Sequence, residues 1–204
     1  MMNLERRRGA RGMAPAVALL LVVWCAPALA HPGAHHATLA GAAAFDGLLS
    51  ALAAGFLHPL SGLDHLLAIA AAGVWSARQP RGARLLPLYL AAMLPGALAG
   101  AAGLALPGLE TGIAATVAAS GMLVMAATLR LPAPAAMALL AGFAALHGNA
   151  HGLELPLAAT AGFLAASGML LWAGRRLGAR LSVGSMKVAG AGVAATGLML
   201  LAAG

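Results

Sequence analysis

The chain has 204 residues, of which 62% are hydrophobic and only 8% are Asp, Glu, Lys or Arg. Soluble domains carry about 25% charged residues, so this composition excludes a water-soluble fold, and its apolar content excludes a disordered chain. The apolar runs are long and do not alternate with polar residues, and aromatic residues make up only 4% of the chain. A membrane β-barrel would show short alternating strands and aromatic girdles, so we predict an all-α membrane protein.

The first 30 residues have the features of a secretory signal peptide. A cluster of arginines precedes a short apolar stretch, which is followed by the small-residue cleavage signature Ala28-Leu29-Ala30. We therefore expect a cleavable signal peptide over residues 1–30 and a membrane domain over residues 31–204; the alternative is an uncleaved first membrane helix. Because the single cysteine, Cys25, lies in the signal segment, the mature chain is expected to have neither disulfides nor thiolate metal ligands.

Charge-free apolar runs predict six membrane-spanning helices in the mature chain. About 20 apolar residues cross a bilayer, and the runs are close to this length. The first span contains the interruption HPLSGLDH, where Pro59 and Gly62 favour a broken or partly re-entrant helix. Small residues within the spans predict close packing of neighbouring helices. The predicted spans cover residues 52–77, 85–106, 109–129, 132–148, 155–174 and 187–203.

The basic residues predict the orientation of the chain in the membrane. In the mature chain they fall in three loops, at residues 78–84, at Arg130 and at residues 175–187. Basic residues accumulate on the cytoplasmic side of a membrane, so these three loops are expected to face the cytoplasm. The mature amino terminus and the carboxyl terminus are then both periplasmic, in the inner membrane of a bacterium.

The remaining ionisable residues gather in the outer half of the predicted bundle. An ionisable group inside a membrane is costly and usually faces a cavity or a partner. The simplest arrangement is one wet vestibule that opens to the exterior. Its candidate members are His31, His35, His36, His58, His65, His147, His151, Asp46, Asp64, Glu110 and Glu154.

The segment HPLSGLDH is the first candidate metal site. His58 and His65 are seven residues apart, so a straight helix would separate them by about 10.5 Å along its axis. A break between them would allow both to reach one ion together with Asp64. The alternative role for Asp64 is to cap a half-helix that starts after Gly62, but this does not explain the two histidines.

The segment LHGNAHGLELP is the second candidate. His147 and His151 are four residues apart and Glu154 is three further on, so on a helix the three would share one face. Two imidazoles at this spacing chelate metal in zinc proteases, and the carboxylate could bind the metal or fix a histidine tautomer. Two glycines and Pro156 indicate that a helix ends here, so the alternative is a polar helix end with histidines at the headgroup level.

Two further groups are candidate secondary metal ligands. His31, His35 and His36 would capture ions near the mature amino terminus, or belong to a flexible tail. Glu110 precedes the third span, where a carboxylate also complements the helix dipole. The combined donors are imidazole and carboxylate, which suit Ni²⁺, Co²⁺ or Zn²⁺ better than Cu⁺. Donor chemistry does not choose among these three ions.

With these motifs, the sequence resembles the HupE/UreJ family of membrane proteins, which is associated with nickel supply to hydrogenase and urease. The matching features are the histidine after the predicted cleavage site, HPLSGLDH, LPGLETGIA and LHGNAHGLELP, and the resemblance covers essentially the mature chain. Many relatives have another histidine in the second half of the fifth span, where this chain has Trp172. The resemblance implies six spans and a nickel, or cobalt, permease that uses His58, Asp64, His65, His147, His151 and Glu154.

We therefore expect facilitated diffusion of a divalent metal, foremost Ni²⁺, from the periplasm to the cytoplasm for hydrogenase or urease maturation. The ion is the substrate, so we expect no prosthetic group and no enzyme activity. The sequence lacks the G-x-x-x-x-G-K-[ST] nucleotide motif, and no ATP or nucleic-acid partner is expected. The alternatives are a membrane metal sensor or assembly factor without a pore, and an intramembrane metalloenzyme with Glu154 as its acid or base.

The predicted topology also suggests an internal repeat. Spans 1–3 and 4–6 each carry one histidine motif. A repeat with an odd number of spans inverts the second half relative to the first, as in many transporters. Inverted repeats are thus a further hypothesis for this chain.

Overall fold

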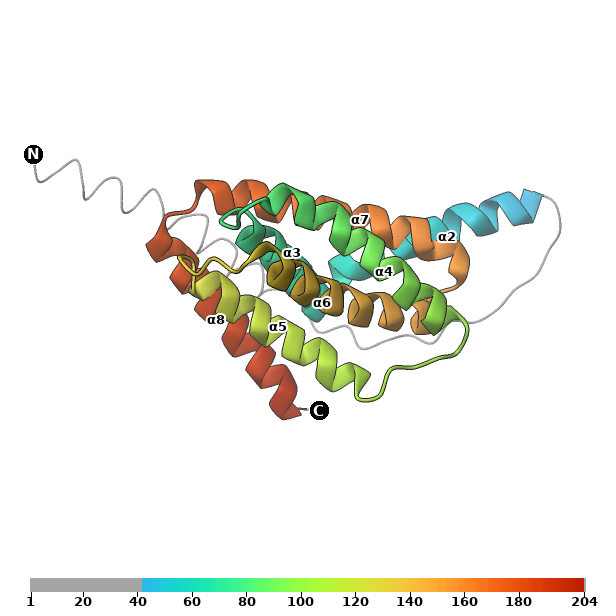
Figure 1. Ribbon diagram of the computed structural model, residues 1–204. Coiled ribbons are helices and arrows are strands. Elements are labelled where there is room, and N and C mark those ends of the chain that lie inside the picture. The colour runs from blue at the N-terminus through green and yellow to red at the C-terminus, as the bar shows by residue number, and fades with distance from the viewer. Residues whose placement is uncertain (1–41, 204) are drawn as a thin grey trace, which may run out of the picture.

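The computed structural model describes residues 42–203, and in this part of the chain every regular element is a helix. The helices form one elongated bundle (Figure 1). The predicted signal peptide and the predicted ligands His31, His35 and His36 lie outside the described residues. The elements are α2 (Ala42–Ser61), α3 (Leu63–Ser76), η1 (Gly82–Arg84), α4 (Leu85–Ala101), α5 (Leu109–Met125), α6 (Ala133–Glu154), η2 (Leu157–Ala159), α7 (Thr160–Arg180) and α8 (Val183–Ala203).

Several of these helices have the length and composition of membrane spans. Three helical segments are each long and apolar enough to cross a membrane, namely Gly82–Ala101, Leu157–Arg180 and Val183–Ala203. α2 and α3 are long and apolar enough to cross a membrane only when they are taken together, and they are bent by 77° relative to each other. α5 is apolar but has 17 residues. The described chain is therefore an all-helical membrane protein, whereas the number of six spans stays a prediction.

The predicted interruption of the first span lies at Gly62. This residue has an extended backbone, with φ −80° and ψ 115°, and it separates α2 from α3. Its N–H still donates to the carbonyl of His58 at 3.0 Å, so the chain turns without losing this hydrogen bond. A Cβ at position 62 would lie 3.1 Å from Oδ1 of Asp64 and 3.3 Å from Nδ1 of His65. Glycine therefore leaves room for these two side chains, while Pro59 lies inside α2 and not at the break.

Helices approach each other closely where glycines face a neighbouring backbone. Gly148 and Gly152 of α6 lie so near the carbonyls of Met93 and Ala97 of α4 that an added Cβ would overlap them. This packing explains why α6 extends to Glu154, beyond the end at residue 148 that the sequence suggested. The two glycines form a contact surface within the helix, and the helix ends only before Pro156.

The helix contacts of the two halves repeat each other. α4 packs along α6 as α7 packs along α3, and α5 packs along α8. In the matching contacts, every α3 residue is separated from its α6 counterpart by the same number of residues. The same holds for every α4 residue and its α7 counterpart. This pattern supports the hypothesis of inverted repeats. The matching contacts are Gly73–Leu171 with Gly148–Met93, Ala70–Gly174 with Ala145–Gly96, and Val74–Gly178 with Asn149–Gly100.

The loops that carry the basic residues lie together at one end of the bundle, here called the basic end. Nη2 of Arg78 donates to the carbonyl of Leu181 at 2.6 Å, which joins the α3–α4 loop to the α7–α8 loop. The side chain of Gln79 donates to the carbonyl of Leu129 at 2.9 Å and accepts from the N–H of Leu131 at 3.0 Å. These bonds tie the α5–α6 loop to the same end, so the loops that the sequence assigned to one side do lie together.

Candidate metal centre

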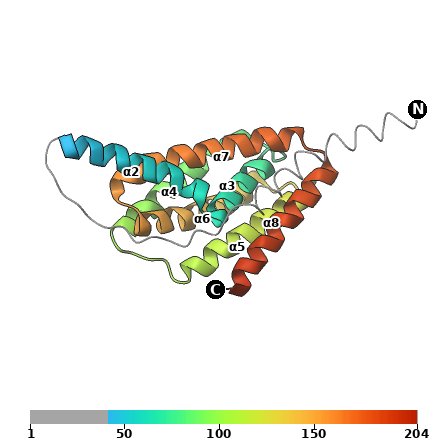
Figure 2. The ribbon, with the colours of Figure 1, turned by 180° about the vertical axis from the view of Figure 1, so that it is seen from behind.

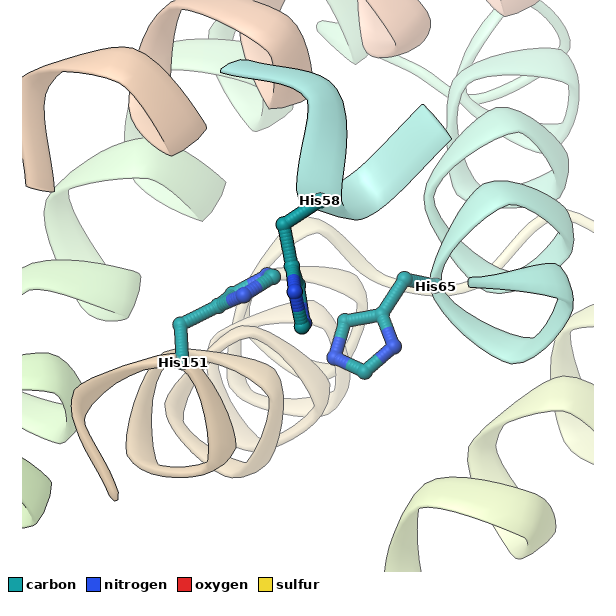
Figure 3. Close-up of side chains that lie close together, drawn as sticks. All are labelled: His58, His65 and His151. Atoms are coloured by element: carbon teal, nitrogen blue, oxygen red, sulfur yellow. The ribbon is translucent and has the colours of Figure 1, made fainter. Parts of the chain in front are cut away.

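Three histidines from three helices converge inside the bundle (Figure 3). His58 lies in the last turn of α2, His65 in the first turn of α3 and His151 in the last turn of α6. The ring centroid of His65 is 5.5 Å from that of His58 and 4.5 Å from that of His151. The ring centroids of His58 and His151 are 4.9 Å apart. The break at Gly62 thus brings two residues from one sequence motif to the same point as a residue from the other. We call these three residues the histidine cluster.

The histidine cluster presents nitrogen atoms that have no hydrogen-bond partner. His65 and His151 are buried, and Nε2 of His65 and both ring nitrogens of His151 are unpaired. Buried polar atoms in proteins are nearly always hydrogen-bonded, so unpaired ones need an explanation. One nitrogen from each histidine lies within 4.8 Å of the others. Ligands of one metal ion, each about 2 Å from it, are roughly 3 Å apart, so modest ring rotations would close the cluster around an ion.

Asp64 orients one member of the cluster. Its Oδ1 accepts a hydrogen bond from Nδ1 of His65 at 2.8 Å and another from the backbone N–H of the same residue at 2.7 Å. The hydrogen of the neutral imidazole therefore lies on Nδ1, and Nε2 keeps a lone pair for a metal. The N-cap of α3 is Gly62, without a side-chain cap bond, so Asp64 does not cap the half-helix as an N-cap residue; it lies in the first turn and acts on His65.

Glu154 lies at the edge of the histidine cluster. Its Oε2 is 3.0 Å from Nε2 of His58, and its side chain is 38% exposed. The carboxylate therefore contacts both the solvent and the cluster. It holds His58 from the exposed side, at the point where an ion would enter.

His147 lies one helical turn deeper than His151. Its ring centroid is 4.8 Å from that of His65, and its side chain is fully buried. Nε2 of His147 is 2.7 Å from Oγ1 of Thr116 on α5, while Nδ1 has no partner. All six residues proposed from the two motifs are thus close together, but they form two layers with His147 in the deeper one.

A cavity of about 300 Å³ lies beside the histidine cluster, and His65 is the member of the cluster that lines it. Three carboxylates surround it, those of Asp64, Glu110 and Glu154, and Glu110 and Glu154 are exposed. We call this the carboxylate end of the bundle. Glu110 lies in the first turn of α5, so the predicted secondary ligand does face the same vestibule. Asp46, which was also assigned to this vestibule, is exposed on α2 and does not line the cavity.

The cavity lies where the bundle is splayed. α5 and α8 stay together but diverge from α6 towards the end where the last residues of α8 lie (Figures 1 and 2). α6 and α8 make almost no contact, whereas α3 packs against α5. The cavity between these helices connects the carboxylate end with His65.

Two residues near the histidines were not predicted from the sequence. The ring of Phe163 on α7 stacks on His151, with centroids 4.5 Å apart and an angle of 14° between the planes. Thr116 on α5 bonds to His147. A hydroxyl within an apolar span was the only available signal for Thr116. No local pattern marks Phe163, because its position depends on how α7 packs against α6.

Asn149, between the two histidines of α6, has a structural role. Its Nδ2 donates to the carbonyl of Leu104 at 2.8 Å, and its Oδ1 accepts from the N–H of Leu106 at 2.9 Å. The side chain is fully buried and holds the α4–α5 loop. Both polar atoms of this side chain bond to the α4–α5 loop, so we do not include Asn149 among the candidate metal ligands.

Comparison with known proteins places this arrangement in a family. Residues 18–200 match the family model described as HupE / UreJ protein. The chain belongs to the HupE/UreJ family. It is 42% identical over 187 residues to Protein HupE of Rhizobium leguminosarum bv. viciae, and the match covers 85% of this chain and 93% of that protein. No solved structure matches the chain significantly.

Trp172, where the family resemblance implies a histidine in many relatives, is not part of the metal centre. Its side chain is 55% exposed on the outside of the bundle, and the guanidinium of Arg176 lies 4.9 Å above its ring. The departure from the family pattern therefore leaves the histidine cluster complete.

Proposed function

We propose that this HupE/UreJ protein carries a divalent metal ion, foremost Ni²⁺ and also Co²⁺, into the cytoplasm by facilitated diffusion. The observation that carries this proposal is the set of unpaired, buried ring nitrogens next to a carboxylate-lined cavity that His65 itself lines. Imidazole and carboxylate donors suit these borderline ions. The ion is the substrate, and its destination is hydrogenase or urease maturation, as the family name suggests.

Capture begins at the carboxylate end. A negatively lined cleft with apolar walls concentrates cations from solution, and Asp64, Glu110 and Glu154 provide this charge. The ion then exchanges water for the nitrogens of His58, His65 and His151. These nitrogens lie within 4.8 Å of one another, so the rings would have to rotate to close around an ion and could rotate back to release it. Loose coordination suits a carrier, which must release its ion.

The orientation follows from the two chemically different ends. The basic end faces the cytoplasm and the carboxylate end faces the periplasm of a bacterial inner membrane, with both mature termini on the periplasmic side. α5 and α6, which do not meet the length and hydropathy criteria for a span, run along α8 and α4, which do. This packing supports six crossings, with α2 and α3 as one broken span. Cleavage of residues 1–30 as a signal peptide belongs to the same proposal.

The inverted repeat suggests how an ion would pass through the bundle. In this structure α3 packs against α5, whereas the equivalent pair, α6 and α8, is apart. Exchange of these two arrangements would close the carboxylate end and open the basic end. Inverted repeats commonly give transporters this kind of alternating access. Energy would come from the ion gradient, the membrane potential or trapping of the ion in the cytoplasm.

Flux through pure protein in liposomes tests the proposal. The wild type should admit Ni²⁺ to an enclosed indicator, and variants of His65 or His151 should not. Asp46→Asn is the matched control, because it removes an exposed carboxylate that does not line the cavity. Metal binding without flux would favour a sensor or assembly factor. Metal-dependent turnover of a substrate without flux would favour an enzyme.

A further inference from the structure

The hydroxyl of Thr116 contacts a histidine on a neighbouring helix. Its Oγ1 is 2.7 Å from the carbonyl of Ile113 on its own helix and 2.7 Å from Nε2 of His147 on α6. Thr116 is 2% exposed and His147 is fully buried, so water does not compete for these bonds. The hydroxyl of Thr196, in contrast, bonds only to the carbonyl of Gly192 on its own helix.

The hydrogen count of this contact fixes the tautomer of His147. A hydroxyl has one hydrogen, and the carbonyl of Ile113 can only accept. If that hydrogen pointed to His147, two oxygens 2.7 Å apart would face each other with no hydrogen between them. The hydroxyl therefore donates to Ile113 and accepts from Nε2 of His147. A neutral imidazole has its hydrogen on one nitrogen only, so Nδ1 of His147 keeps its lone pair.

The free nitrogen lies in the deeper layer of the site. Nδ1 of His147 is buried and has no hydrogen-bond partner, and the ring lies 4.8 Å from that of His65. Asp64 leaves Nε2 of His65 free, and Thr116 leaves Nδ1 of His147 free. Two adjacent rings are thus each prepared to bind a metal through a defined atom.

We infer that Thr116 is a positioning residue, whose hydroxyl accepts the Nε2 hydrogen of His147 and presents Nδ1 as the inner ligand for the transported ion. The ion then passes from His58 and His151 to the inner ligand, which lies one turn away on α6, while His65 contacts both layers. This inference rests on the proposed function, because it assigns a direction of passage. The tautomer itself does not depend on transport and can be tested alone.

Nitrogen NMR of protein labelled at histidine tests the tautomer without metal. The signal of His147, assigned by its loss in His147→Gln, should show hydrogen on Nε2 in the wild type. Thr116→Ser should keep this signature, and Thr116→Val, which has the same shape without the hydroxyl, should lose it. Hydrogen on Nδ1 in the wild type, or an unchanged signature in Thr116→Val, would overturn the inference. A purely structural role of Thr116 would change stability but not follow the hydroxyl in this way.

Metal flux in liposomes tests the consequence for passage. Removal of a group that orients a metal ligand typically weakens binding about 10- to 100-fold, so flux should fall by about that factor in Thr116→Val. Thr116→Ser keeps the hydroxyl and should transport like the wild type. Thr196→Val is the matched control and should transport like the wild type. Normal flux in Thr116→Val would refute the role in passage. Absence of flux in the wild type would instead refute the proposed function, while the NMR result would still decide the tautomer.

Discussion

The two ends of the bundle are built from equivalent helices but have opposite chemistry. At the carboxylate end, α6 and α8 are apart and a cavity of about 300 Å³ is lined by three acids and by His65. Towards the basic end, α3 packs on α5, and Gln79 holds the α5–α6 loop with two hydrogen bonds. The cavity in this half, about 230 Å³, is lined by apolar residues such as Val74, Val124 and Val193.

This difference indicates where the barrier to passage lies. A divalent ion finds ligands as far as His147, but an apolar lining beyond them offers none. Charge is costly in such surroundings unless it is paired or solvated. In the proposed function the basic half would have to rearrange before an ion leaves, and the bonds of Gln79 are among the contacts that would oppose this step. The four experiments that follow test the two halves separately.

Loss of a ring nitrogen from the histidine cluster should have the largest effect. His65→Ala and His151→Ala each remove an unpaired buried nitrogen, so Ni²⁺ influx into liposomes should fall at least about 100-fold. Asp46→Asn should leave influx unchanged. If either histidine variant transports normally, the cluster does not lie on the path.

Loss of the charge of Asp64 should have an intermediate effect. The amide of Asp64→Asn can still approach His65, but it gives up the charged acceptor that holds the Nδ1 hydrogen. Metal affinity, measured by isothermal titration, should fall roughly 10-fold or more, as for other groups that orient a metal ligand. Unchanged affinity would show that Gly62 and the helix break alone place His65.

Removal of the Gln79 side chain should affect only the basic half. Gln79→Leu leaves the carbonyl of Leu129 and the N–H of Leu131 without these partners. This should lower the stability of the closed basic end by about 1–3 kcal/mol. A thiol placed in the apolar cavity by Val124→Cys, in a chain with Cys25→Ser, should then react about 10-fold faster with a water-soluble reagent. Equal rates with and without Gln79 would mean that these hydrogen bonds do not keep the basic end closed.

The smallest effect is expected at the mouth of the cavity. Glu110 is exposed, so Glu110→Gln should reduce Ni²⁺ influx only a few-fold through weaker attraction of the cation. The difference from the wild type should vanish at high salt, which screens exposed charges. A loss that persists at high salt would make Glu110 a direct ligand.

Both histidine motifs could be predicted because ionisable residues are rare in the spans. The spacing of His147, His151 and Glu154 matches a helix face, and Gly62 marks the break that brings His58 to His65. Their meeting in one cluster depends on the packing of α2 and α3 against α7 and of α6 against α4, which the sequence indicates only through the cost of isolated charges in a membrane.

Other features depend on packing between helices that are apolar on every side. Such helices have no polar face to indicate their neighbours, so the sequence did not place Phe163 beside His151 or Thr116 beside His147. For the same reason, Gly148 was interpreted as part of a helix end. In the bundle it lets α6 lie against the backbone of α4, which only the partner helix makes evident.

X-ray absorption at the nickel edge of the loaded protein tests the central claim most directly. We predict a nitrogen shell with the outer scattering of imidazole rings, which weakens when His65→Ala and His151→Ala are combined and persists in Asp46→Asn. A shell of oxygen atoms alone, or a spectrum that the double variant does not change, would contradict metal binding by the histidine cluster.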